Sequence, residues 1–147
     1  MNTKRAYPKD VKNFEYDGDE AKILESFNWR LQLENYLSIG PGWIFEDNKK
    51  TLVLAGYYQL SPGVLQVWML FNKSAKHFAK SLVKEFRQIL SEGMELQGIH
   101  RIQTLIDSTK EKDEAFAKLV GFKKEAKLEA FGPRKEDVIL YKMLKCS

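Results

Sequence analysis

Apolar residues at helical spacing are clearest between Ser74 and Glu92, where Phe78, Leu82 and Phe86 recur every four residues. This spacing predicts an amphipathic helix that Gly93 ends. The same side of the helix carries Ala75, Ala79 and Ile89.

Two further segments show the same helical period. The first runs from Asp19, a plausible N-cap, to about Ser38, and the tripeptide Gly40-Pro41-Gly42 ends it. Its predicted apolar positions are Ile23, Leu24, Phe27, Leu31 and Leu33. The second, Asp113 to Val120, precedes Gly121, which suits a left-handed C-cap.

Runs rich in β-branched and aromatic residues predict the strands. Residues 1–18 form either a short first strand or an irregular arm, and Ser61-Pro62-Gly63 is the turn of an antiparallel hairpin. The remaining predicted strands are Trp43 to Glu46, Thr51 to Leu60, Val64 to Leu70, Ile99 to Ile106, Lys123 to Phe131 and Val138 to Leu144.

The order of these elements predicts the fold class. A strand, the long helix and another strand in succession imply one right-handed parallel crossover, which pairs Val64–Leu70 with Ile99–Ile106 and lets them part at Leu70. We therefore expect one α/β (α+β) domain over residues 1–147. Its twisted, mixed sheet is mostly antiparallel and has helices on both faces.

The composition is that of a globular chain, with 44% hydrophobic and 12% aromatic residues. No apolar run is long enough to cross a membrane, and no signal peptide precedes the first predicted element. Cys146 has no disulfide partner, and no Cys/His cluster has metal-ligand spacing. These features indicate a soluble, cytoplasmic protein without a metal site.

The formal net charge is +4, and five basic residues meet a single acidic one, Glu85, between Lys73 and Arg87. Such a stripe suits an anionic partner, although a solvated helix face has the same pattern. Phe78 and Phe86 lie on the opposite side, which argues against nucleic acid because base stacking needs exposed aromatic rings.

Three segments resemble the GNAT (N-acetyltransferase-like) superfamily. His100–Asp107 is similar to the fifth strand of that fold, Ala115–Glu125 to its "LxxLGFxxE" helix and turn, and Asp137–Met143 to its last strand. The resemblance covers Val64 to Leu144. It implies the GNAT fold, acetyl-CoA as cofactor and an amine as acceptor.

In that family a loop written Arg/Gln-x-x-Gly-x-Gly/Ala wraps the pyrophosphate of acetyl-CoA, because backbone amides at a helix start attract anions. The three signature positions fall on Ser74, His77 and Ala79, so His77 replaces the first glycine. The resemblance assigns cofactor binding to Met69, Leu70, Phe71, Lys73, Ser74, Ala75, Lys76, His77 and Ala79.

The catalytic positions depart further from the family. Lys110 stands where the family often has an asparagine, and Ala117 replaces the tyrosine that commonly protonates the leaving thiolate. Tyr141 and His77 are the remaining candidates for acid–base catalysis. Trp68 either lines an acyl channel or belongs to the core.

A narrower resemblance joins Gln66–Leu70 and Lys73–Arg87 to the small acetyltransferase-like internal-virion and assembly proteins of short-tailed bacteriophages. Two functions therefore remain open. One is an acyl-CoA-dependent N-acyltransferase, and the other is a non-catalytic phage protein that binds an acidic protein or nucleic acid in the host cytoplasm or the virion.

Overall fold

The computed structural model describes residues 1–18, 21 and 27–146, which form two compact units. Unit 1 comprises residues 1–58 and 68–79, and unit 2 comprises residues 59–67 and 80–147. The cap predicted at Asp19 and the core positions predicted at Ile23 and Leu24 lie outside the described residues.

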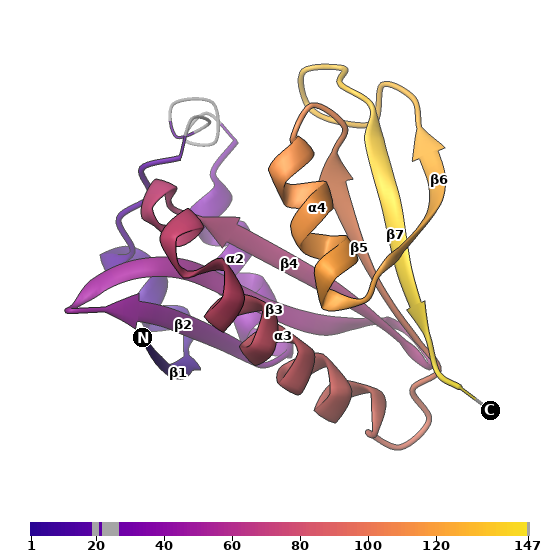
Figure 1. Ribbon diagram of the computed structural model, residues 1–147, viewed down its shortest axis with the longest axis horizontal. Coiled ribbons are helices and arrows are strands. Elements are labelled where there is room, and N and C mark those ends of the chain that lie inside the picture. Colours follow the sequence, from indigo (N-terminus) through magenta and orange to yellow (C-terminus); the bar gives the residue numbers. More distant parts are fainter. Residues whose placement is uncertain (19–20, 22–26, 147) are drawn as a thin grey trace. The chain divides into compact units, whose positions relative to one another are not determined.

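The described strands form a seven-stranded sheet with the order β1-β2-β3-β4-β5-β7-β6 (Figure 1). Strands β4 and β5 are parallel, as the crossover predicts, and the sheet is otherwise mostly antiparallel. This topology confirms the predicted fold class. The strands are β1 (Asn2–Ala6), β2 (Gly42–Asp47), β3 (Lys50–Ser61), β4 (Val64–Phe71), β5 (Arg101–Asp107), β6 (Lys123–Leu128) and β7 (Val138–Leu144).

The helices of the described residues include two 3-10 segments. These are η1 (Pro8–Asn13) and η2 (Lys73–Phe78), and the α-helices are α2 (Trp29–Ile39), α3 (Ala79–Met94) and α4 (Glu111–Val120). None of the helices in the described ranges is long and apolar enough to cross a membrane.

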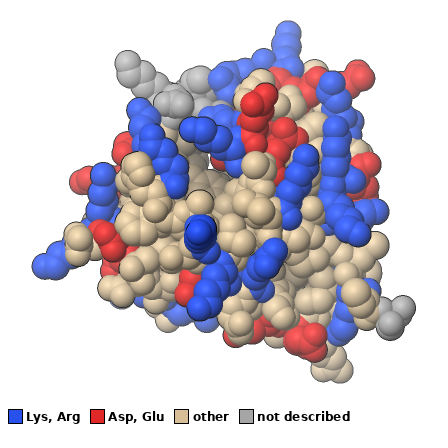
Figure 2. Space-filling model, in the orientation of Figure 1, with Lys and Arg blue, Asp and Glu red and all other residues tan. Residues whose placement is uncertain are grey.

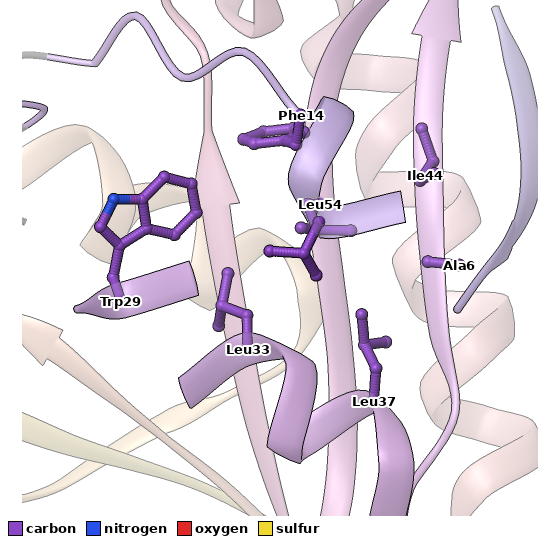
Figure 3. Packing of buried hydrophobic residues seen from close by; sticks show 8 residues of the cluster. Ala6, Phe14, Trp29, Leu33, Leu37, Ile44 and Leu54 are labelled. Atoms are coloured by element: carbon purple, nitrogen blue, oxygen red, sulfur yellow. The ribbon is translucent and has the colours of Figure 1, made fainter. Parts of the chain in front are cut away.

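The core of unit 1 forms where α2 packs on the sheet (Figure 3). Trp29, Leu33 and Leu37 recur every four residues along α2 and are buried against Leu54 and Ile44. The prediction placed Phe27 and Leu31 on this buried side, and it was wrong. Both are exposed, because α2 begins at Trp29 and its buried stripe follows from that start.

The start of α2 is fixed by contacts from the N-terminal arm. Asn28, just before the helix, is left-handed (φ 53°), which breaks the helical path at that residue. The Arg30 guanidinium donates to the carbonyl oxygens of Val11 and Phe14 at 2.7 and 2.8 Å, and it also stacks over the Trp29 ring. The arm is therefore tied to the first turn of α2.

The long predicted helix differs from the structure at both ends. Its first turns are the 3-10 segment η2, and Gly93 lies buried inside α3, which continues to Met94. Ala79 is exposed, whereas Leu82, Phe86 and Leu90 form the buried side. Glycine is tolerated inside a helix when the surrounding packing compensates, so Gly93 was a misleading stop signal.

In unit 2, α4 ends at Gly121 as the sequence predicts. The Gly121 amide donates to the carbonyl of Lys118, and the Phe122 amide donates to that of Ala117. These two bonds form a Schellman motif, which needs the positive φ of 123° that glycine adopts at little cost. Helices α3 and α4 meet through an edge-to-face contact of Phe86 with Phe116.

Candidate functional site

The parallel pairing of β4 with β5 is short and ends abruptly. Register partners run from Val64 with Arg101 to Val67 with Thr104, and the Thr104 hydroxyl donates to the Val67 carbonyl at 3.1 Å. Among the described residues, no residue of β5 pairs with Trp68–Phe71. The pairing thus ends three residues before Leu70, where the sequence predicted the parting.

The end of β4 is anchored by Asn72, which is buried. Its Nδ2 group donates to the carbonyl oxygens of Glu15 and Thr51, each at 2.9 Å, and its Oδ1 accepts the amide of Asp17 at 2.9 Å. The Asn72 amide also donates to the Leu52 carbonyl at 2.8 Å. One side chain therefore fixes the N-terminal arm, β3 and the start of η2 together in unit 1.

At least two of the five amides of the Lys73–His77 turn, which the resemblance places against phosphate, are already bonded inside the protein. The Lys73 amide donates to Asp17 Oδ1 at 2.8 Å, and the Ala75 amide donates to the Asn72 carbonyl at 3.0 Å. The Asp17 carboxylate thus already accepts the hydrogen bond of the first of these amides. Lys73, Ser74, Ala75, Lys76 and His77 form a 3-10 segment.

The side chains of η2 divide into exposed cationic groups and one buried hydroxyl. Lys73, Lys76 and His77 are exposed, and Ala75 is buried. Ser74 Oγ is buried and has no hydrogen-bond partner in the described part of the chain. A buried hydroxyl without a partner costs free energy.

The four other residues assigned to the cofactor lie on either side of η2. Met69, Leu70 and Phe71 are half-buried at the end of β4, and Ala79 is exposed at the start of α3. All of these residues belong to unit 1. The structure therefore brings the whole predicted cofactor segment onto one strand end and the turn that follows it.

The basic stripe is only partly available to a partner. On α3, Lys80 and Lys84 are exposed, but Arg87 donates to the Leu119 carbonyl in the last turn of α4 at 3.0 and 2.6 Å. Arg87 thus satisfies a helix-end carbonyl. Figure 2 shows Lys and Arg side chains spread over the visible face with Asp and Glu side chains among them.

Tyr141, a candidate acid, is fully buried on β7. Its hydroxyl donates to Glu114 Oε1 on α4 at 2.7 Å. Burial and, to a lesser extent, the Glu114 carboxylate raise the pKa of Tyr141 to about 12. The phenol therefore holds its proton toward Glu114, and this geometry does not favour Tyr141 as the acid that faces a substrate.

The two family positions on α4 carry no acid. Lys110 precedes the helix as its N-cap residue, and Ala117 is buried on the inner side of α4. Glu114 lies between them at offsets of four and three residues, and therefore on the same side of the helix. Glu114 was not among the catalytic candidates predicted from the sequence, although this spacing placed it on the same side of α4 as the two family positions.

Aromatic residues gather beside β4 in unit 1. Tyr36 of α2 stacks on Tyr58 with ring centroids 4.6 Å apart and lies 5.9 Å from Trp68. Burial, with Tyr58, raises the pKa of Tyr36 to about 12. Trp68 packs against the core, and its Nε1 is buried without a partner among the described residues. This packing agrees with the interpretation of Trp68 as a core residue.

Within residues 1–18, 21 and 27–146, no three His, Cys, Asp or Glu side chains are grouped so that they could hold a metal ion.

Comparisons with known proteins place the fold. No family model matches the chain, and no curated protein matches it by sequence. Solved structures match along nearly the whole chain. An IAA acetyltransferase from Bacillus cereus has a TM-score of 0.72 at 10% identity, covering 98% of this chain and 99% of the other.

Two further solved structures show the same similarity. An acetyltransferase of the GNAT family from Bacillus anthracis has a TM-score of 0.71 at 15% identity, covering 97% of this chain and 93% of the other. A mutant of the spermidine N-acetyltransferase SpeG from Vibrio cholerae has a TM-score of 0.64 at 16% identity, covering 98% and 95%. The chain therefore has the fold of the GNAT N-acetyltransferases.

Proposed function

We propose that this protein is an N-acyltransferase that uses an acyl-CoA. The observation that carries the proposal is that, in the described part of the chain, Trp68–Phe71 have no pairing partner in β5 and lead within unit 1 into the cationic turn Lys73–His77. A strand end without its parallel partner offers backbone groups to an extended ligand. The GNAT fold, which N-acetyltransferases share, supports the same conclusion.

The residues of the turn fit the anionic part of CoA. Lys73, Lys76 and His77 present exposed donors that suit phosphate groups. The amides of Lys73 and Ala75 are engaged internally, so side chains carry more of this binding than the family loop implies.

The reaction needs little covalent participation by the protein. Bound acyl-CoA supplies an activated thioester, which an amine can attack directly. The chain's own contribution is to hold the two reactants in line and to keep the acyl carbonyl polarised, and positioning of this kind supplies much of the rate in such transfers.

Calorimetry with CoA and acetyl-CoA tests this proposal. We expect wild-type protein to bind both ligands and His77→Glu to abolish binding, because a carboxylate at that position repels phosphate. Lys112→Gln, which changes the net charge equally on exposed α4 surface, is the matched control and should bind like wild type. Absence of binding by wild type at millimolar ligand would overturn the proposal.

A second candidate is a non-catalytic assembly protein on the same scaffold. It is favoured by the two internally bonded loop amides and by His77 at the glycine position. Its relation to phage proteins rests on the sequence resemblance alone. Exposed Lys76 and Lys80 would then contact an acidic protein or nucleic acid.

The two candidates predict different results in infected cells. If the protein assembles into particles, wild type is recovered from purified virions and Lys76→Glu/Lys80→Glu is depleted from them. Absence of wild type from virions and from every assembly intermediate, together with measurable acyl transfer, would exclude the second candidate.

A further inference from the structure

The N-terminal arm of unit 1 carries a carboxylate to the start of the cationic turn. Asp17 Oδ1 accepts the Lys73 amide at 2.8 Å, although the two residues are 56 positions apart in the chain. The buried Asn72 side chain holds the arm beside this contact, because it donates to the Glu15 carbonyl and accepts the Asp17 amide, each at 2.9 Å. All four residues belong to unit 1, so contacts within that unit set the position of the carboxylate.

The Lys73 amide is a donor that either a carboxylate or a phosphate can use. Backbone amides form charge-assisted hydrogen bonds with both kinds of anion. Two anions at one amide would compete for the same hydrogen, and their like charges would repel each other. A phosphate can therefore accept the hydrogen bond of the Lys73 amide only after the Asp17 carboxylate has left it.

The carboxylate can leave while the arm stays in place. Asn72 is buried and bonded to three backbone groups, whereas Asp17 is exposed. Rotation of the Asp17 side chain would move its carboxylate into water without breaking the bond from the Asp17 amide to Asn72. Lys76, which is exposed three residues after Lys73, would then attract the incoming phosphate.

We propose that Asp17 is an internal competitor of the cofactor phosphate and limits the affinity of the Lys73–His77 turn for acyl-CoA. This inference rests on the proposed N-acyltransferase function and adds a residue that controls cofactor binding. When only a fraction of the molecules has the Lys73 amide available, the apparent dissociation constant rises in inverse proportion to that fraction. Removing the competing charge should therefore strengthen cofactor binding.

Calorimetry of two variants with CoA tests this inference. Asp17→Asn keeps an acceptor for the Lys73 amide but removes the charge, so we expect it to bind CoA about 3- to 10-fold more tightly than wild type does. Glu15→Gln removes the same charge two residues earlier, also at an exposed position of the arm. It is the matched control and should bind CoA like wild type.

Amide NMR follows the exchange at Lys73 itself. CoA should shift the Lys73 amide signal of wild type, and Asp17→Asn should reach its bound signal at a lower CoA concentration. If Asp17→Asn does not fold, as circular dichroism would show, the wild-type spectra decide. A Lys73 signal that stays unchanged when wild type binds CoA would mean that the carboxylate keeps its place, which contradicts competition.

The outcomes separate this inference from the proposed function. Unchanged or weaker CoA binding by Asp17→Asn would identify Asp17 as a structural contact only, and an equal gain in Glu15→Gln would assign the effect to overall charge. Either result would overturn the inference and leave the proposed function standing. Failure of wild type and both variants to bind CoA would overturn both.

Discussion

Asn72 is a buried polar residue whose side chain makes three hydrogen bonds to backbone groups of distant segments. A buried donor or acceptor that loses its partner costs about 1–3 kcal/mol. We therefore expect Asn72→Ala to lower the free energy of unfolding by about that amount, measured by urea denaturation.

Two comparisons make this prediction specific. Asn72→Asp keeps the acceptor for the Asp17 amide but loses both donors, so it should also destabilise the protein. Asn35→Ala, at an exposed position of α2, should change stability by less than about 0.5 kcal/mol. Equal effects of Asn72→Ala and Asn35→Ala would contradict the role given to Asn72.

At the scale of elements, the ends of the helices show what sequence patterns can and cannot predict. Gly121 ends α4 as predicted, because its Schellman bonds involve only residues within the same turn. The 3-10 form of η2 was not predicted, because Asp17 and Asn72 hold its first amides and Asp17 is 56 residues from Lys73. Local patterns carry no information about such distant partners.

The candidate site also has one part that the sequence could predict and one part that it could not. The candidate cofactor segment could be proposed from the sequence because it is continuous, from Met69 to Ala79, and its role stays a prediction. The spacing from Lys110 and Ala117 shows which side of α4 carries Glu114, but its hydrogen bond with Tyr141, 27 residues away on another element, required the structure. The order of strands and helices was recovered from hydrophobic periodicity, whereas pairings between distant side chains required the structure.

An ion-pair network joins three strands on one side of unit 2. Glu125 of β6 accepts two bonds from the Arg101 guanidinium of β5, at 2.6 and 3.0 Å, and pairs with Lys142 of β7 at 2.9 Å. Hydrogen bonds from Arg101, then from Lys142, lower the pKa of Glu125 to about 2. The network therefore makes stability depend on pH.

The lowered pKa of Glu125 sets the direction in which stability changes with pH. The unfolded chain binds a proton at Glu125 near pH 4.5, so the network's contribution is present above that pH and is lost as the pH falls toward 2. We expect Glu125→Gln to flatten the fall of the melting temperature between pH 4.5 and 2. Glu129→Gln, at an exposed position just after β6, is the control and should follow wild type.

Ionic strength gives a second check on this network. Because Glu125 is exposed, 1 M salt should reduce the difference between wild type and Glu125→Gln. A difference that salt leaves unchanged would point to packing rather than charge.

For the whole molecule, anion binding could depend on the net charge of +4 or on the turn at Lys73–His77. Two double variants separate these possibilities. Lys76→Glu/Lys80→Glu alters the proposed cofactor turn and the start of α3, whereas Lys9→Glu/Lys112→Glu alters exposed sites elsewhere. Each double variant lowers the formal net charge from +4 to 0, because each substitution removes two charges.

Two measurements on these variants give different expected outcomes. Retention on heparin depends on the summed field of the protein, so both variants should elute at similarly reduced salt. Affinity for CoA depends on local donors, so calorimetry should show weaker binding only for Lys76→Glu/Lys80→Glu. Equal loss of CoA affinity in both variants would mean that net charge alone attracts the ligand. The Lys73–His77 turn would then not be a specific phosphate site.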